Sequence, residues 1–310
     1  MRSDRDLLVD TCLWVWHSTN IGDCPRRRFH MNIWCIASNV DSFVEKHKND
    51  PVPNGDGIHL IFIDYAEIEI RNGDVPAFYI KGEKAELPDA FWMWITNTES
   101  NLVENLLLAS GVRSVVNIAE QDVCRSKVAT YDRLARAGLP VPKTWVFFNH
   151  PDKSSIKSHF PYPFVIKPDR GFGGEGVALI KNDEELDEYL KGIRYGTAYM
   201  VQEYISASRG KDLRVVMLNG ECYVSIVRKA GNPEEFRSNI HQGGSAEKFE
   251  PDEDTIKMCK KAASLFDLKF LGLDLMFGDN GFVFAEVNSF PGLDDRRLKE
   301  VIDVVTGDMK

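Results

Sequence analysis

The sequence lacks the features that mark secreted, membrane-spanning and nucleic-acid-binding proteins. Its six cysteines are scattered without Cys-x-x-Cys spacing, which argues against a disulfide framework or a zinc site and is typical of a cytoplasmic protein. No apolar run approaches the roughly 20 residues that a membrane-spanning helix needs. Positive charge is in deficit, because the formal net charge is −9 at pH 7. We therefore expect no nucleic-acid partner and no membrane partner.

Length and composition are those of a globular protein with room for two or three small domains. The chain has 310 residues, of which 43% are hydrophobic and 27% charged. Residues 1–30 differ in composition from the rest of the chain and are interpreted as a variable N-terminal extension, with Met31 as a hypothetical start. Residues 31–123 predict a small α/β domain, followed by two α+β units at 124–205 and 206–310.

Strand and helix signals alternate along the chain. Helical spacing at 99–110 and 127–137 predicts two helices, the second capped by Ser126 and ended by Gly138. Further helices are expected from Asp183 and near 252–266. The Trp-rich strand at 91–95 is read as core rather than as an acceptor site. Strands are expected at 33–37, 58–63, 68–70, 77–80, 91–95, 115–118, 144–148, 164–167, 177–180, 198–203, 213–218 and 223–228.

Residues 271–292 carry the strongest chemical signal, because they predict a hairpin of two apolar strands that hold hard oxygen ligands. Asp274 lies on the first strand, and Glu286 and Asn288 lie on the second. Side chains two apart on a strand share a face, and hairpin pairing brings Asp274 beside them. Carboxylates among apolar neighbours need neutralisation, and magnesium suits such ligands. The alternative is a solvated strand face.

A glycine-rich segment follows a predicted strand that ends near Lys167. Four glycines occur within six residues, at positions 171, 173, 174 and 176. Glycine lets successive backbone N–H groups approach and surround an anion, and the upstream ammonium group adds to the same attraction. The segment is neither a Walker A loop nor a Rossmann fingerprint. A plain β-hairpin tip is the alternative interpretation.

Two later segments are candidates for contacts with a nucleotide. The strand near 198–203 runs into Gln202, Glu203, Tyr204 and Ile205, which suit either an adenine slot or plain β-core. Asp212 is placed to accept from a ribose hydroxyl, although a salt bridge with Arg214 is equally consistent with the spacing. Cationic residues then follow at 228–229 and 236–244, either as a surface charge run or as a loop that grips phosphate or carboxylate.

Taken together, these motifs resemble the ATP-grasp ligases, and the elements at 237–244 and 286–292 resemble the RimK branch, which contains glutamate ligases. The resemblance is close over 115–300 and loose before it. It implies the ATP-grasp fold, of class α/β and α+β. In that fold the N-terminal α/β (pre-ATP-grasp) domain precedes a small lid subdomain at 124–205 and a large subdomain at 206–310, and the two subdomains grip ATP.

The resemblance also implies a role for each matching position. Arg237, Lys167 and Asn239 would be catalytic, with Arg237 as the main stabiliser of the transferring phosphoryl group. Asp274, Glu286 and Asn288 would hold Mg²⁺ (or Mn²⁺). ATP would contact Lys127, Lys167, Gly173, Gly174, Gly176, Gln202, Glu203, Tyr204, Ile205, Asp212, Arg214, Arg237, Ser238 and Asn239.

The implied activity is that of a carboxylate–amine ligase that forms an amide or peptide bond through an acylphosphate. Its partners would be glutamate or another acid and an amine acceptor, which is a peptide, a protein or a metabolite, and the family suggests a homodimer or homotetramer. Two alternatives stay open at this point. One is an ATP-grasp kinase that phosphorylates a hydroxyl group, and the other is a nucleotide-binding module without turnover.

Overall fold

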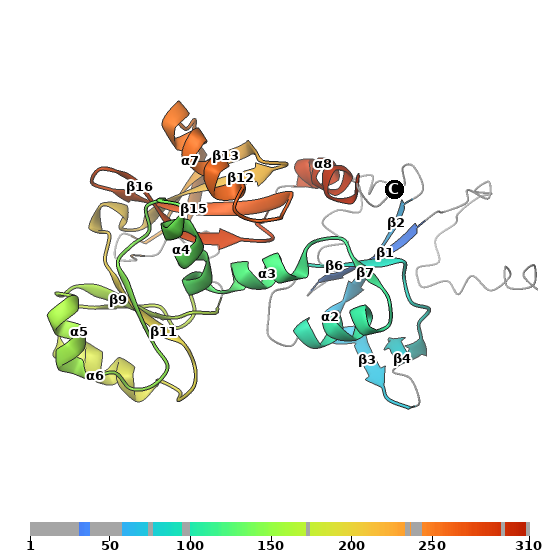
Figure 1. The fold of residues 1–310 in the computed structure, drawn as a ribbon, viewed down its shortest axis with the longest axis horizontal. Helices are drawn as coiled ribbons and strands as arrows, with labels where there is room; N and C mark the ends of the chain where they lie inside the picture. The colour runs from blue at the N-terminus through green and yellow to red at the C-terminus, as the bar shows by residue number, and fades with distance from the viewer. Residues whose placement is uncertain are drawn as a thin grey trace, which may run out of the picture.

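The computed structural model describes residues 31–37, 58–73, 77–94, 100–171, 174–232, 236, 244–292 and 295–307. Within these ranges the strands form four sheets, which helices cover (Figure 1). The expected N-terminal extension, residues 1–30, lies outside the described residues.

A parallel sheet with the strand order β2-β1-β6-β7 forms the N-terminal part. Both of its faces are buried, because α2 (Ser100–Ala109) packs on one and α8 (Asp295–Thr306) on the other. Burial on both sides explains why its strands are continuous apolar runs. The strands are β1 (Met31–Ala37), β2 (Ile58–Asp64), β6 (Ala90–Met93) and β7 (Arg113–Ser114).

A small antiparallel sheet is inserted between β2 and β6 and begins after the 3-10 helix η1 (Tyr65–Glu67). It consists of β3 (Ile68–Arg71), β4 (Ala77–Ile80) and β5 (Glu83–Lys84). Phe78 of β4 is buried in the same core as α2, so this insertion is part of the N-terminal unit.

The next unit is an antiparallel sheet with the order β10-β9-β11-β8, called the small sheet below. Its strands are β8 (Thr144–Phe147), β9 (Phe164–Pro168), β10 (Ala178–Ile180) and β11 (Tyr199–Glu203). Helices α5 (Lys153–His159) and α6 (Asp183–Lys191) cover one face (Figure 1). The fully buried side chains of this core all come from residues 147–201, so the small sheet has a core of its own.

The last sheet has five antiparallel strands in the order β14-β13-β12-β15-β16 and is called the large sheet below. After the 3-10 helix η2 (Ser206–Ser208), its strands are β12 (Lys211–Leu218), β13 (Glu221–Lys229), β14 (Ser245–Lys248), β15 (Phe270–Gly278) and β16 (Gly281–Asn288). Helix α7 (Glu253–Ala263) packs on it, as does the end of α4 (Lys127–Arg136), which contributes Leu134 to the same core.

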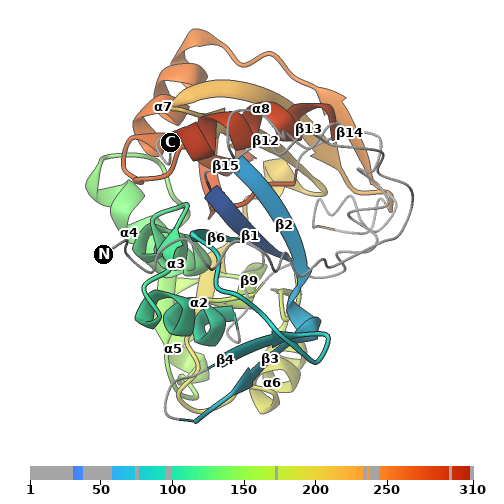
Figure 2. The same cartoon turned by 90° about the vertical axis from the view of Figure 1, so that its right-hand side faces the viewer.

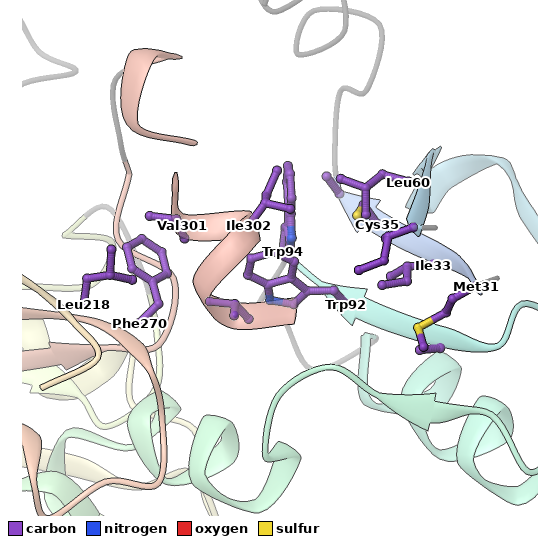
Figure 3. Close-up of a cluster of buried hydrophobic side chains, with 14 of the residues drawn as sticks. Met31, Ile33, Cys35, Leu60, Trp92, Trp94, Leu218, Phe270, Val301 and Ile302 are labelled. Carbon is purple, nitrogen blue, oxygen red and sulfur yellow. The ribbon is translucent and has the colours of Figure 1, made fainter. Parts of the chain in front are cut away.

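The N-terminal sheet and the large sheet share one hydrophobic core with α8 between them (Figures 1 and 2). Val301 and Ile302 of α8 lie between Trp92 of β6 and Phe270 of β15, as Figure 3 shows. Phe290 extends this core, because its ring stacks on Trp94 with the centroids 5.1 Å apart. The Trp-rich strand is therefore core, as the sequence predicts.

Most expected strands are confirmed, but the region before Lys127 differs from the prediction. The strand expected at 115–118 is wrong, because β7 ends at Ser114 and α3 (Ile118–Arg125) begins four residues later. The side chain of Asn117 caps α3 by accepting a hydrogen bond from the Glu120 N–H group. Sequence analysis also missed α5 and α8. The cap of α4 is confirmed, since Ser126 accepts from the Ala129 N–H group, and Gly138 has the expected positive φ of 73°.

In the part of the chain that the structure describes, none of the helices has the length and apolar character that crossing a membrane requires.

The shared core predicts that α8 is essential to stability. Replacing Ile302 by Ala removes a buried side chain at the contact of both sheets, so we expect the free energy of unfolding to fall by about 2–5 kcal/mol. Asp303→Ala, an exposed change one position along, is the matched control and should stay within about 0.5 kcal/mol of the original chain. Urea titration measures both variants, and equal stability of the two would contradict this packing.

Candidate functional site

A β-bulge in the 271–292 hairpin places the side chains expected to bind metal on one face of the sheet. Asp274 pairs with Glu286, whereas the next residue, Leu275, pairs with Phe284, so Ala285 is an extra residue on β16. Without this bulge, Phe284 and Glu286 would share one face of the sheet. With it, Phe284 enters the core and Glu286 lies on the face of Asp274. Sequence reasoning brought the three oxygen ligands together by simple alternation and missed the bulge. The sequence signal for the bulge is that the core residues Phe284 and Val287 are three positions apart, whereas residues on one face of a regular strand are an even number apart.

Asp274 is the most deeply buried of these ligands, with 3% of its surface exposed. The Nε and Nη2 atoms of Arg214 each donate to one of its carboxylate oxygens at 2.7 Å, and Arg228 lies 3.0 Å away. The Asn288 amide also donates to Asp274, at 3.2 Å. Burial raises the pKa of Asp274, but the two guanidinium groups outweigh it and hold this pKa well below its usual range.

Asp212 and Arg228 form a second buried pair on the neighbouring strands. They are cross-strand partners of β12 and β13, and the Arg228 Nε atom donates to Asp212 at 2.7 Å. Arg214 and Asp274 are the corresponding partners of β12 and β15. Arg228 was noticed in the sequence only as one of several cations. Its pairing with Asp212 depends on strand register, which composition does not reveal.

The start of α4 links the hairpin to the glycine-rich loop. The Lys127 Nζ atom lies 3.2 Å from Glu286 and donates to the carbonyl oxygen of Gly171 at 3.1 Å. Asp169, just before that loop, accepts from the Ser126 hydroxyl group at 3.0 Å and from the Val128 N–H group at 2.8 Å. These contacts hold the start of α4 against the beginning of the glycine-rich loop.

Lys167 lies on β9, on the face that looks away from the small-sheet core. Its Nζ atom donates to the Tyr131 hydroxyl group at 3.3 Å, and Tyr131 in turn donates to the carbonyl oxygen of Ala285 at 2.6 Å. Burial lowers the pKa of Lys167 to about 8, although the nearby charges of Glu286 and Asp169 act to raise it. Lys167 is thus a buried cation close to the hairpin.

The expected adenine segment borders a cavity of about 290 Å³ beside the small sheet. The cavity is lined by Pro163, Leu179, Lys181, Tyr204, Arg209 and Phe236. Gln202 is buried and donates to Thr144 at 3.1 Å, and Glu203 accepts from the Lys143 N–H group at 2.7 Å. Ile205 is half-buried at the end of this segment.

The described part of the glycine-rich loop is closely packed. Gly174 lies in the turn that leads into β10. Gly176 has a positive φ of 69°, and a side chain at this position would come within 3.1 Å of Pro168. Gly173 lies outside the described residues, as do Arg237, Ser238 and Asn239. Their expected roles stay predictions.

Three carboxylates of this site are paired with cations: Asp212 with Arg228, Asp274 with both Arg214 and Arg228, and Glu286 with Lys127. A divalent cation fits the donor set of Asp274, Glu286 and Asn288, because two carboxylates and an amide oxygen are ligands that Mg²⁺ takes. Among the described residues no three His, Cys, Asp or Glu side chains converge as a metal site, and in this donor set the third oxygen would come from the Asn288 amide. Cation binding would free the paired Arg and Lys side chains for an anionic ligand.

Comparison with known proteins agrees with this chemistry. The family model described as RimK-like ATP-grasp domain matches residues 124–307. A probable alpha-L-glutamate ligase of Marinomonas sp. is 34% identical over 175 residues, which cover 55% of this chain and 57% of the relative. Human N-acetylaspartylglutamate synthase A is 31% identical over 173 residues, which cover 54% and 44%. The chain therefore spans about half the length of the curated relatives that it matches.

Solved structures show the same fold at lower sequence identity. A RimK domain ATP-grasp protein from Sphaerobacter thermophilus has a TM-score of 0.63 at 17% identity, and 90% of this chain and 97% of that one are covered. The D-alanine–D-alanine ligase from Bacillus anthracis has a TM-score of 0.64 at 17% identity, with coverage of 88% and 91%. The fold is thus the ATP-grasp fold, as the sequence predicts.

The buried ion pairs predict a specific pattern of stability. Asp274→Asn leaves Arg214 and Arg228 without their shared carboxylate, so the nucleotide-free protein should lose about 3–5 kcal/mol of unfolding free energy. Adding Arg214→Gln removes the uncompensated charge of Arg214, so the double variant should recover part of the lost unfolding free energy. Urea titration without metal or nucleotide measures both variants. A single variant as stable as the original chain would contradict the pairing.

Proposed function

The chain belongs to the RimK-like ATP-grasp family, and we propose that it is an ATP-dependent carboxylate–amine ligase. The observation that supports this most directly is the set of paired charges on the large sheet, beside which lie Lys127 of α4 and Lys167 of the small sheet. Lys127 and Lys167 lie beside the carboxylate face of the hairpin, where a triphosphate and its metal would meet. Such a site provides electrostatic stabilisation and needs no protein nucleophile.

The proposed reaction has two steps. A substrate carboxylate attacks the γ-phosphate of ATP, which breaks the bond to the β-phosphate oxygen and yields an acylphosphate and ADP. The substrate amine then attacks the acyl carbon, phosphate leaves, and an amide bond forms with loss of a proton. Both steps place developing negative charge on oxygen atoms, which the cations of the site are suited to stabilise.

Different residues of this chain would contact the phosphates, the adenine and the ribose of ATP. Lys127 and Lys167 would contact phosphates together with the loop that holds Gly173, Gly174 and Gly176. The segment 202–205 would line adenine, beside the cavity described above. Asp212 would accept from a ribose hydroxyl, with Arg214 and Arg228 holding the carboxylates in place.

Asp274, Glu286 and Asn288 would hold Mg²⁺ (or Mn²⁺), which supplies charge neutralisation to the phosphate oxygens when bound. Arg237, Ser238 and Asn239 would meet the γ-phosphate and the acid. Arg237 is proposed as the main stabiliser, because a guanidinium group binds two oxygens at once.

The proposed acid is glutamate or another amino acid, because the Marinomonas relative is named a probable alpha-L-glutamate ligase. The acceptor is an amine of a peptide, a protein or a metabolite. We further propose that 31–123, 124–205 and 206–310 act as the pre-ATP-grasp domain, the lid and the large subdomain. A cytoplasmic homodimer or homotetramer is the proposed state.

Trapping with hydroxylamine tests the reaction class. With ATP, Mg²⁺ and the correct acid, hydroxylamine should replace the amine and give a hydroxamate along with ADP, because the activated acyl group reacts with this nucleophile. Coloured iron–hydroxamate complexes report the product across a panel of amino acids. Phosphorylation of a hydroxyl group without hydroxamate would indicate a kinase instead, and absence of ADP release in every mixture would indicate a module without turnover.

The lowered pKa of Lys167 predicts how nucleotide affinity depends on pH. Only the protonated amine attracts phosphate, so the affinity for Mg·ATP should be full below about pH 8 and should fall as pH rises through that value. Lys167→Arg is the matched control, because a guanidinium group stays charged and its affinity should be flat from about pH 7 to 9. Calorimetry at fixed ionic strength measures both, and parallel pH curves would refute the assignment.

A further inference from the structure

We propose that Tyr131 is a positioning residue, whose hydroxyl group joins the phosphate-contacting Lys167 to the bulge that orients the metal ligands. This inference rests on the proposed function for the role of Lys167. It deepens that function by naming the group that couples the small sheet to the large sheet. Nothing in the sequence motifs singled out Tyr131.

The hydroxyl group of Tyr131 is a junction of three elements. It donates to the carbonyl oxygen of Ala285 on β16 at 2.6 Å and accepts from the Lys167 Nζ atom on β9 at 3.3 Å. The ring itself lies on α4 and is buried. One oxygen atom on α4 therefore contacts β9 of the small sheet and β16 of the large sheet.

The bond to Ala285 bears on the metal ligands. Ala285 is the extra residue of the bulge, so it has no partner position on β15 in the register of the two strands. A carbonyl group that leaves the ladder needs another donor, since an unsatisfied and partly buried acceptor costs about 1–3 kcal/mol. Tyr131 supplies that donor beside Glu286. Burial raises the pKa of Tyr131, so its hydroxyl group stays protonated and able to donate.

The bond to Lys167 bears on the phosphates. The lysine side chain is long and flexible, and its ammonium group needs fixed acceptors to hold one position in a buried site. The Tyr131 hydroxyl group is such an acceptor, and the ammonium group also lies 5.7 Å from the centre of the Tyr131 ring. Without this hydrogen bond the ammonium group would still lie near the Tyr131 ring, but it would no longer be held in one position.

Tyr131→Phe removes the hydroxyl group and keeps the ring, which preserves the packing of α4. Tyr223→Phe is the matched control, because Tyr223 of β13 donates to Glu300 of α8 at 2.6 Å. We expect the dissociation constant for Mg·ATP, measured by calorimetry, to rise about tenfold in Tyr131→Phe and to stay unchanged in Tyr223→Phe. In a Lys167→Met background, Tyr131→Phe should weaken binding by much less than tenfold, because the contact with Lys167 is already lost and only the contact with the bulge remains to be removed.

Amide hydrogen exchange of the nucleotide-free protein tests the contact between Tyr131 and the bulge. Residues 284–288 should exchange faster in Tyr131→Phe than in the original chain, Tyr223→Phe or Lys167→Met. Unchanged exchange there, or a tenfold loss of affinity that persists in the Lys167→Met background, overturns the positioning role. If the original protein does not bind Mg·ATP, the proposed function itself is refuted. If Tyr131→Phe binds Mg·ATP as the original protein does, only this inference is refuted.

Discussion

Strand β16 contributes an apolar side chain to the core and polar side chains to the site, and the bulge at Ala285 makes both possible. The first half of β16 packs Phe284 into the core of the large sheet, and the second half presents Glu286 and Asn288 to the site. A regular strand with this sequence would bury a carboxylate or expose a phenylalanine. The contact of Lys127 with Glu286 and that of Tyr131 with Ala285 both depend on that single extra residue.

The small sheet has a hydrophobic core separate from the one that joins the N-terminal sheet to the large sheet. The N-terminal sheet, α8 and the large sheet share one core, whose members come from β1, β6, β12 and β15 as well as from α8. The small sheet has a core drawn from its own strands and helices. Its contacts with the rest include the polar contacts of Lys127 and Tyr131 described above. Polar contacts of this kind can be exchanged for contacts with a ligand at little cost, which apolar core packing does not permit.

Sequence reasoning succeeded where the signal was local and failed where it depended on register. The strands of the small sheet, and those of the large sheet except the exposed β14, follow from apolar runs and glycine turns, and the family resemblance follows from motif order. Helix α3 escaped because its start depends on the cap at Asn117, and α8 escaped although Val301, Ile302 and Val305 have helical spacing. The proximity of Asp274 to Glu286 was anticipated, but the pairing of Arg228 with Asp212 required knowledge of which residues lie opposite each other.

The pairing of carboxylates with cations at the site has a thermodynamic consequence. At the proposed site, a metal ion that arrives alone would displace Arg214 or Lys127 and leave them uncompensated, and a polyphosphate that arrives alone would do the same to the carboxylates. Each ligand would remove the penalty that the other meets, so the two would act as positive heterotropic effectors of one another, with equal coupling in both directions.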